Sequence, residues 1–177
     1  MQGNTTAQLR GSWRNFSKYR PLIRELVTRD LKVKYRRSFL GYVWSILNPL
    51  LMMLLQTLVF SYMFRFQIEN FPLYLICGNT LFNFFNESTN MGMGSVLGNS
   101  SLIKKVYVPK FIFPISRVVS SFVNLLFSLA AILLVMLITR SPFHLTILLV
   151  WAPLVLLFLF TCGMALLLSA LAVYFRD

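Results

Sequence analysis

The stretch DLKVKYRRSFLGYVWSILNPLLMMLLQ, Asp30–Gln56, changes from a cationic segment to an apolar one within two residues. Up to Arg37 it is rich in Lys and Arg, and from Phe39 onward it is almost wholly apolar. A helix rises about 1.5 Å per residue and the hydrocarbon core of a bilayer is about 30 Å thick, so about 20 apolar residues span it. The stretch therefore predicts a membrane-spanning helix directly behind a positively charged segment.

Four apolar segments of sufficient length follow one another along the 177 residues. The chain is 57% hydrophobic and only 12% charged, and its mean hydropathy is +0.69. Soluble domains carry about 25% charged residues, so this chain lacks the polar side chains to cover a soluble globule. We therefore expect an all-α integral membrane protein, with a single membrane domain over residues 21–177. The four expected spans are residues 40–64, 72–97, 118–138 and 145–173.

The formal net charge of +12 is concentrated beside these apolar segments. Ten of the 17 Lys and Arg residues precede Phe39, and four more lie within residues 99–117. Because positively charged loops stay on the cytoplasmic side of a membrane, we expect the N-terminus, residues 99–117 and Asp177 in the cytoplasm. Charges that flank apolar runs act as orientation signals and lipid-headgroup contacts, so we expect no nucleic-acid partner.

The residues before the first span predict a polar cytosolic tail over 1–20 and an amphipathic helix over about 21–39. Pro21 suits the first turn of such a helix. Apolar residues then repeat every four positions, and charged residues occupy the other side. The apolar residues are Ile23, Val27, Leu31, Tyr35 and Phe39, and the charged ones are Arg24, Glu25, Arg29, Lys32 and Arg36. We expect this helix to lie in the membrane interface, the alternative being a simple cluster of flanking charges.

The second span is interrupted by polar residues. Because a carboxylate at the centre of a bilayer costs about 3 kcal/mol, Glu87 should face a partner or water. One interpretation is a polar translocation pathway, and the other is a structural hydrogen-bond cluster or a position close to the headgroups. The candidate pathway residues are Phe82, Asn83, Phe84, Phe85, Asn86, Glu87 and Asn90. The three Phe residues have the alternative of packing or facing lipid.

Two further features predict how the spans are shaped and packed. Asn48-Pro49 removes a backbone donor inside the first span and predicts a kink there. Ser88, Gly92 and Ser95 share one face of the second span, and small residues on a shared face predict the close approach of another helix.

The chain offers little for catalysis. It contains five acidic residues and one His, and it lacks the Gly-rich loop with Lys that cradles nucleotide phosphates. We therefore expect no catalytic residue, no metal site and no cofactor bound by this chain.

Three motifs, in this order, resemble a known family. They are YRRSFLGYVWSILNPLL (35–51), NSSLIKKVYVPKFIFPISR (99–117) and YFRD (174–177). In their order and spacing they are similar to the permease subunits of ABC exporters of bacterial surface polysaccharides, which export O-antigen, capsule or teichoic acid. The resemblance implies an inner-membrane permease that moves lipid-linked glycan. It also implies a homodimer and two separate ATPase subunits, which bind the ATP and Mg.

The resemblance also implies which residues contact the ATPase. On the interface helix these are Asp30, Lys34, Arg36 and Arg37. On a cytoplasmic coupling helix they are Leu102, Ile103, Lys104, Lys105 and Tyr107. The family has six spans and four are expected here, so we expect the fifth and sixth beyond residue 177.

Three other functions remain as alternatives. An ABC exporter of a drug or small lipid is the nearest. A membrane transferase acting on polyprenyl lipids would need clustered acids or His near the headgroups. A non-catalytic scaffold of a polysaccharide assembly complex is the third.

Overall fold

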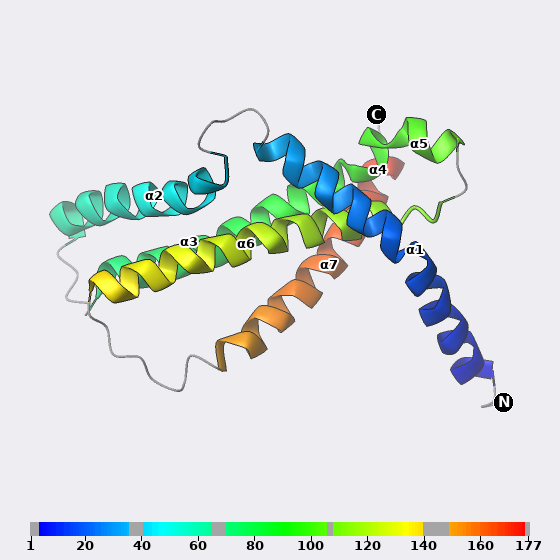
Figure 1. The fold of residues 1–177 in the computed structure, drawn as a ribbon, viewed down its shortest axis with the longest axis horizontal. Coiled ribbons are helices and arrows are strands. Elements are labelled where there is room, and N and C mark those ends of the chain that lie inside the picture. The colour runs from blue at the N-terminus through cyan, green and yellow to red at the C-terminus, as the bar shows by residue number, and fades with distance from the viewer. Residues whose placement is uncertain (1–3, 36–40, 65–69, 106–107, 140–148, 176–177) are drawn as a thin grey trace.

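The computed structural model describes residues 4–35, 41–64, 70–105, 108–139 and 149–175, and these residues form seven α-helices and no strand. The all-α prediction is therefore confirmed (Figure 1). The helices are α1 (Asn4–Tyr35), α2 (Gly41–Phe64), α3 (Phe71–Met93), α4 (Ser95–Gly98), α5 (Ser100–Lys105), α6 (Ile112–Ile138) and α7 (Trp151–Tyr174). Arg36, Arg37 and Tyr107, which the sequence singled out, lie outside the described residues.

Three helices in the described part of the chain are long and apolar enough to cross a membrane: α2, α6 and α7. The expected second span, α3, has 23 residues, which is about 35 Å of helix and also long enough. Its composition is more polar because Asn79, Asn83, Asn86, Glu87 and Asn90 all lie on it. The fold accommodates these side chains because α3 packs against α2, α6 and α7.

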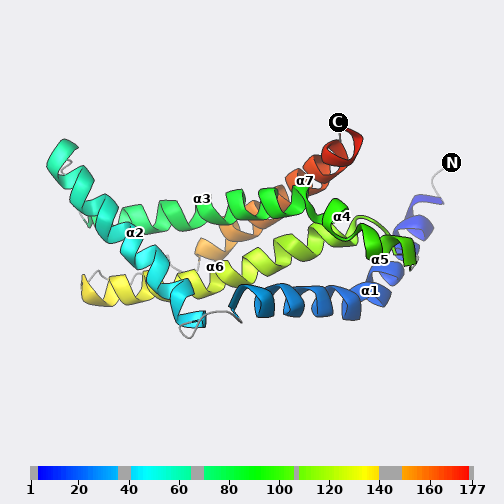
Figure 2. The same ribbon diagram turned by 90° about the horizontal axis from the view of Figure 1, so that it is seen from above.

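Several helix boundaries differ from the expectation. α6 begins at Ile112, six residues before the expected start of the third span, and α7 begins at Trp151, six residues after the expected start of the fourth. α1 begins at Asn4 and contains Pro21, so the stretch expected as a tail is helical and Pro21 lies inside the helix. Figures 1 and 2 show a bend in α1, as a missing donor and the bulk of a proline ring produce. The expected second span over 72–97 ends as α3 at Met93, and α4 follows after Gly94.

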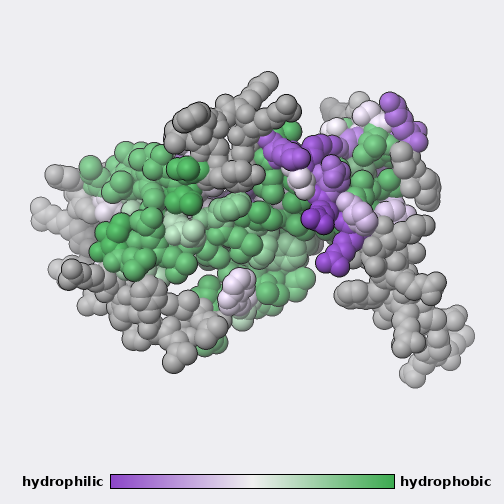
Figure 3. All heavy atoms as spheres, viewed as in Figure 1, coloured by the Kyte–Doolittle hydropathy of each residue, from purple (hydrophilic) through white to green (hydrophobic). Residues whose placement is uncertain are grey.

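The helices α2, α3, α6 and α7 alternate in direction, and α1 crosses one end of α6 obliquely (Figures 1 and 2). α4, α5 and the end of α7 gather at the same end, which we call the α1 end. In Figure 3, polar residues gather at the α1 end and apolar residues cover the rest of the described surface on that face. This division is typical of a membrane domain with one polar end.

Three apolar clusters hold the helices together. One joins α3, α6 and α7 through Phe84, Val118, Leu125, Leu154 and Ala165. A second joins α2, α3 and α6 through Met53, Ile76, Ala131 and Val135. The third lies at the α1 end, where Leu26 of α1 is buried with Ile112 and Phe113 of α6, and Leu102 and Ile103 of α5 pack against them. Of the predicted apolar residues of α1, Ile23 belongs to this cluster, together with Leu22 and Leu26.

A buried ion pair also fixes α1 on α6. The carboxylate of Asp30 accepts from Arg117 Nη1 of α6 at 2.9 Å, and the Asp30 side chain is only 6% exposed. Arg29 contacts the same carboxylate at 3.3 Å, and Ser120 donates to it at 3.5 Å. Arg29 also donates to Asn99 Oδ1 at 3.3 Å, which brings in the segment between α4 and α5. These contacts compensate the loss of hydration that burial of the carboxylate causes.

The close approach predicted from Ser88, Gly92 and Ser95 occurs between α3 and α7. A Cβ placed on Gly92 would lie 2.7 Å from Cβ of Ala165, which is shorter than any normal carbon contact. Ser88 and Ser95 are fully buried beside it. Gly92 is therefore needed for the separation between these two helices.

Gly92→Ala should destabilise the protein by about 1–3 kcal/mol, because α3 and α7 must separate to admit the methyl group. The thermal midpoint of the detergent-solubilised protein measures this. Gly163→Ala on α7 is the matched control, because a Cβ there meets nothing within 4 Å and its midpoint should not fall. Equal midpoints for the two variants would show that a methyl group fits between α3 and α7 without separating them.

Asp30→Asn should loosen α1 from α6 and cost about 3–5 kcal/mol, because it leaves Arg117 without its counter-ion in a largely buried place. Deuterium exchange of the α1 backbone amides measures the effect as faster exchange along the helix, because a loosened helix opens its hydrogen bonds to water more often. Glu25→Gln makes the same chemical change at an exposed position of the same helix and should leave the exchange rate unchanged. Equal rates for both variants would contradict the anchoring role of Asp30.

Candidate functional site between α1, α2, α3 and α6

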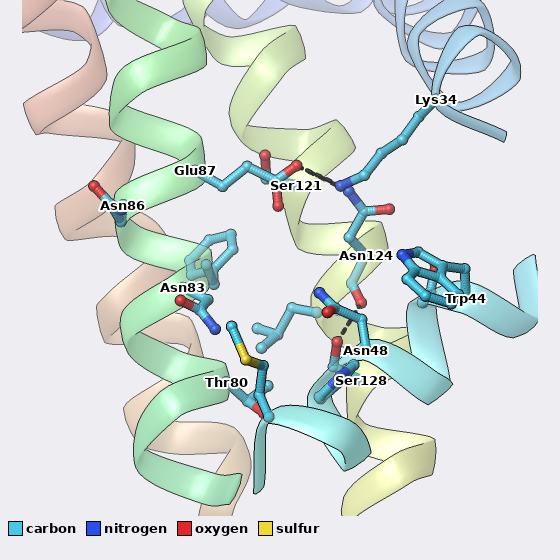
Figure 4. Close-up of a pocket in the computed structure, with 15 residues that line it drawn as sticks. Lys34, Trp44, Asn48, Thr80, Asn83, Asn86, Glu87, Ser121, Asn124 and Ser128 are labelled. Carbon is cyan, nitrogen blue, oxygen red and sulfur yellow. Dashed lines mark hydrogen bonds and ion pairs between the residues drawn. The ribbon is translucent and has the colours of Figure 1, made fainter. Parts of the chain in front are cut away.

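A polar cleft of about 400 Å³ lies between α2, α3 and α6 (Figure 4). Its polar lining comes from all three helices and from the end of α1. The residues are Lys34 of α1, Ser45 and Asn48 of α2, Thr80, Asn83, Asn86 and Glu87 of α3, and Ser121, Asn124 and Ser128 of α6. Trp44, Pro49, Met52, Phe84 and Leu125 complete the wall. The cleft thus brings amide and hydroxyl groups together inside an otherwise apolar bundle.

Helical periodicity places these groups on common faces. On α6, residues 121, 124 and 128 are three and four positions apart, which is one stripe of a helix. On α3, residues 80, 83 and 87 follow the same spacing. Thr80 is 5% exposed, and its hydroxyl has no hydrogen-bond partner among the described residues. A buried hydroxyl without a partner is costly, so the cleft favours water or a ligand that supplies hydrogen bonds.

Glu87 closes the cleft at the α1 end. Its Oε1 accepts a hydrogen bond from Lys34 Nζ at 2.6 Å and another from Asn124 Nδ2 at 3.2 Å. Figure 4 shows Lys34 reaching from α1 toward Glu87, with Asn124 beside them. The two charged side chains are 43% and 33% exposed, so the ion pair is only partly shielded from water. Partly exposed pairs of this kind contribute about 0.2–1 kcal/mol to stability.

A second cavity of about 500 Å³ lies on the other side of this pair, beneath α1. Lys34, Glu87 and Asn124 line both cavities. The anchoring groups of α1 line only the second one, and they are Arg29, Asp30, Asn99, Arg117 and Ser120. The Lys34–Glu87 pair therefore stands at the boundary between two polar spaces.

The predicted interface-helix residues do not all face outward. Asp30 is buried against Arg117, and Lys34 pairs with Glu87. On α5, Leu102 and Ile103 are partly buried and pack toward α1. Lys104 and Lys105 are exposed. Lys34 is exposed as well but is paired with Glu87, whereas neither of these two lysines takes part in an ion pair among the described residues.

The seven predicted pathway residues divide between two faces of α3. Asn83, Phe84, Asn86 and Glu87 line the polar cleft. Phe82 and Phe85 instead line an apolar groove of about 510 Å³ against α7. Phe85 stacks there on Phe160 with ring centroids 5.7 Å apart. Successive helical residues turn by about 100°, so a continuous run such as 82–87 cannot share one face.

Asn90, the last of the seven, is exposed and donates to Asn86 Oδ1 at 2.8 Å. Sequence reasoning missed the other walls of the cleft, which are Asn48 on α2 and Ser121, Asn124 and Ser128 on α6. The signal for the α6 wall is in the sequence, because its three polar residues follow helical spacing inside an apolar span.

Comparisons with known proteins cover most of the chain. The O-antigen export system permease protein RfbA of Myxococcus xanthus is 35% identical over 168 residues, which is 93% of this chain and 63% of that protein. RfbA of Klebsiella pneumoniae is 32% identical over 155 residues, 86% of this chain and 59% of that protein. The polysialic acid transport protein KpsM of Escherichia coli is 27% identical over 154 residues, 81% of this chain and 57% of that protein.

This chain therefore spans less than two thirds of the length of these relatives. Residues 21–177 match the family described as ABC-2 type transporter. That match begins at Pro21 in α1 and includes every helix that forms the polar cleft. The apolar helices and the polar end of the bundle agree with a membrane-spanning protein. The chain belongs to the ABC-2 type transporter family.

Proposed function

We propose that this chain is the permease subunit of an ATP-driven exporter of lipid-linked polysaccharide. The cargo is an O-antigen, capsule or teichoic-acid chain that moves from the cytoplasmic to the outer face of the bacterial cell membrane. The observation that carries the proposal is the similarity, over 93% of the chain, to a protein named for O-antigen export. The amide and hydroxyl groups of the cleft support it, because the many hydroxyls of a glycan both donate and accept hydrogen bonds.

The proposed assembly contains two copies of this permease and two copies of a separate ATPase subunit, which holds ATP and Mg. The permease lies in the inner membrane in this arrangement. Its N-terminus and α5 are on the cytoplasmic side. The concentration of Lys and Arg before Phe39 and within residues 99–117 supports that orientation. Lys104 and Lys105 are exposed at the α1 end and are the proposed points of contact with the ATPase.

A continuous set of contacts connects α5 to the polar cleft. Leu102 and Ile103 pack in the same apolar cluster as Leu26 of α1. α1 is then joined to α6 by the Asp30–Arg117 pair and to α3 by Lys34–Glu87. Because close-packed groups transmit displacement with little compression, a push on α5 is passed to the walls of the cleft.

The runner-up is an ABC exporter of a drug or small lipid, and one observation favours it. The groove between α3 and α7 is lined by apolar residues, among them Phe82, Phe85 and Phe160. Such a groove suits an acyl chain or an apolar drug better than a glycan. A glycan-export assay with the whole transporter, alongside a drug-efflux assay, distinguishes the two functions.

Lys104→Glu combined with Lys105→Glu should abolish most export while leaving ATP hydrolysis by the partner active. The charge reversal removes the proposed electrostatic contact but lies outside the cleft. Glycan appearing at the cell surface and ATPase activity of the purified complex are the two measurements. Both measurements require that the ATPase subunit co-purifies with the wild-type permease, which is checked first.

Two matched controls accompany this variant. Lys104→Arg with Lys105→Arg keeps both charges and should retain export. Lys110→Glu makes the same reversal at an exposed lysine outside α5 and should have a much smaller effect. Normal export by the Lys104→Glu, Lys105→Glu protein would contradict the coupling role of α5.

A further inference from the structure

The Lys34–Glu87 ion pair occupies the place where the two polar cavities meet. The cleft of about 400 Å³ lies on one side and the cavity of about 500 Å³ beneath α1 on the other. Lys34, Glu87 and Asn124 belong to the lining of both. A change in the position of the Lys34 side chain therefore changes the passage between the two spaces.

This ion pair differs from the other links between α1 and the bundle. Asp30–Arg117 joins α1 to α6 through a carboxylate that is only 6% exposed. Lys34–Glu87 joins α1 to α3, and its side chains are 43% and 33% exposed. Among the ion pairs of the described residues it is the one that connects these two helices. The anchor is thus shielded from water, whereas the pair at the boundary is accessible to it.

Separation of the pair also costs little free energy, because each charged group has another hydrogen-bonding partner. Glu87 keeps the hydrogen bond from Asn124 Nδ2, 3.2 Å away, when Lys34 leaves. Lys34 stands in the last turn of α1, and a lysine side chain at that exposure regains water as its new partner. A partly exposed ion pair shifts the equilibrium between its paired and separated states by at most about fivefold. Neither charge is left buried without a partner after separation.

The far end of the cleft is crossed by a different contact. Asn79 Nδ2 of α3 donates to Gln56 Oε1 of α2, one helical turn beyond the cleft residues Met52 of α2 and Asn83 of α3. An amide pair carries no net charge and does not respond to the charges at the α1 end. At the α1 end, by contrast, the contact across the boundary is the charged pair Lys34–Glu87.

We propose that Lys34 and Glu87 form a latch that regulates access to the polar cleft from the cavity beneath α1. With the pair formed, the cleft is separated from that cavity. With the pair broken by movement of α1, the two cavities join into one polar recess. This inference rests on the proposed function for its cargo, but the latch itself is a property of this chain and is measurable without cargo or ATPase activity.

Cysteine accessibility in the full-length transporter tests the latch. Ser128→Cys on α6 introduces a thiol into the cleft, in a protein whose Cys77 and Cys162 are replaced by Ala. A membrane-impermeant, negatively charged methanethiosulfonate is added to inside-out vesicles, and the rate of thiol modification is measured. Lys34→Gln and Glu87→Gln should each raise the rate, by about fivefold for a pair of this exposure.

The two single variants together separate a latch from a charge effect on the reagent. Lys34→Gln removes a positive charge and Glu87→Gln a negative one, so attraction or repulsion of the reagent changes the rate in opposite directions. Loss of the latch raises it in both. The exchange Lys34→Glu with Glu87→Lys should restore slow modification. Lys32→Gln, at an exposed position of the same helix, should leave the rate unchanged.

Unchanged rates in both single variants, or changes of opposite sign, would overturn the latch. If Glu87→Gln fails to fold, as judged by its elution in size-exclusion chromatography, Lys34→Gln alone decides, because a charge effect would lower its rate and loss of the latch raises it. If Lys34→Gln fails to fold, a positively charged methanethiosulfonate is used with Glu87→Gln, because the charge effect then lowers the rate and loss of the latch still raises it. Failure of the proposed function has a separate signature. In that case the latch variants alter modification as expected, while the wild-type transporter exports no glycan.

Discussion

The buried Asp30–Arg117 ion pair determines the register of α1 on the bundle, and the other contacts of α1 follow from it. Leu26, Asp30 and Lys34 are four residues apart and so share one face of the helix. The first enters an apolar cluster, the second a shielded ion pair and the third a partly exposed one. Burial therefore falls along this face toward the polar cleft. A shift of α1 by one turn would place Leu26 or Lys34 opposite Arg117, and either pairing would leave a buried guanidinium uncompensated.

The outline of the fold follows from periodicity and length. Apolar runs of about 20 residues predict α2, α6 and α7, and the alternating apolar and charged faces predict the amphipathic α1. The start of α1 was not predictable from Pro21, because a proline is accepted at the start of a helix and also, with a bend, inside one. The break of the second span near Gly94 was equally ambiguous, since glycine both ends helices and occurs within membrane helices.

The site was only partly predictable, for a physical reason. The cost of a charge in hydrocarbon identified Glu87 as a residue that needs a partner, yet the partner lies 53 positions away in the sequence. Lys34 was interpreted as a contact with the ATPase subunit because the resemblance to polysaccharide exporters implied it. Local pattern places a residue on a face of its own helix, whereas the neighbour across that face depends on how the helices cross. To predict that Asn48 and Asn124 line the cleft, one must know how α2 and α6 cross α3.

The contact of Gly92 with Ala165 shows how differently the walls of the cleft are held by the rest of the bundle. With no space for a methyl group between them, α3 and α7 are in close contact there, and both share a core with α6. α2 meets α3 differently: at the α1 end the two are separated by the cleft, and farther along Met53 packs against Ile76. α2 is the least enclosed of the three apolar spans, since 6% of its apolar stretch is buried against 28% for α6 and 22% for α7. Ile46 and Leu50 tie it to the Met53 cluster. The wall of the cleft that carries Trp44 and Asn48 is thus the one least held by the rest of the bundle, whereas the boundary with the cavity beneath α1 is formed by Lys34 and Glu87.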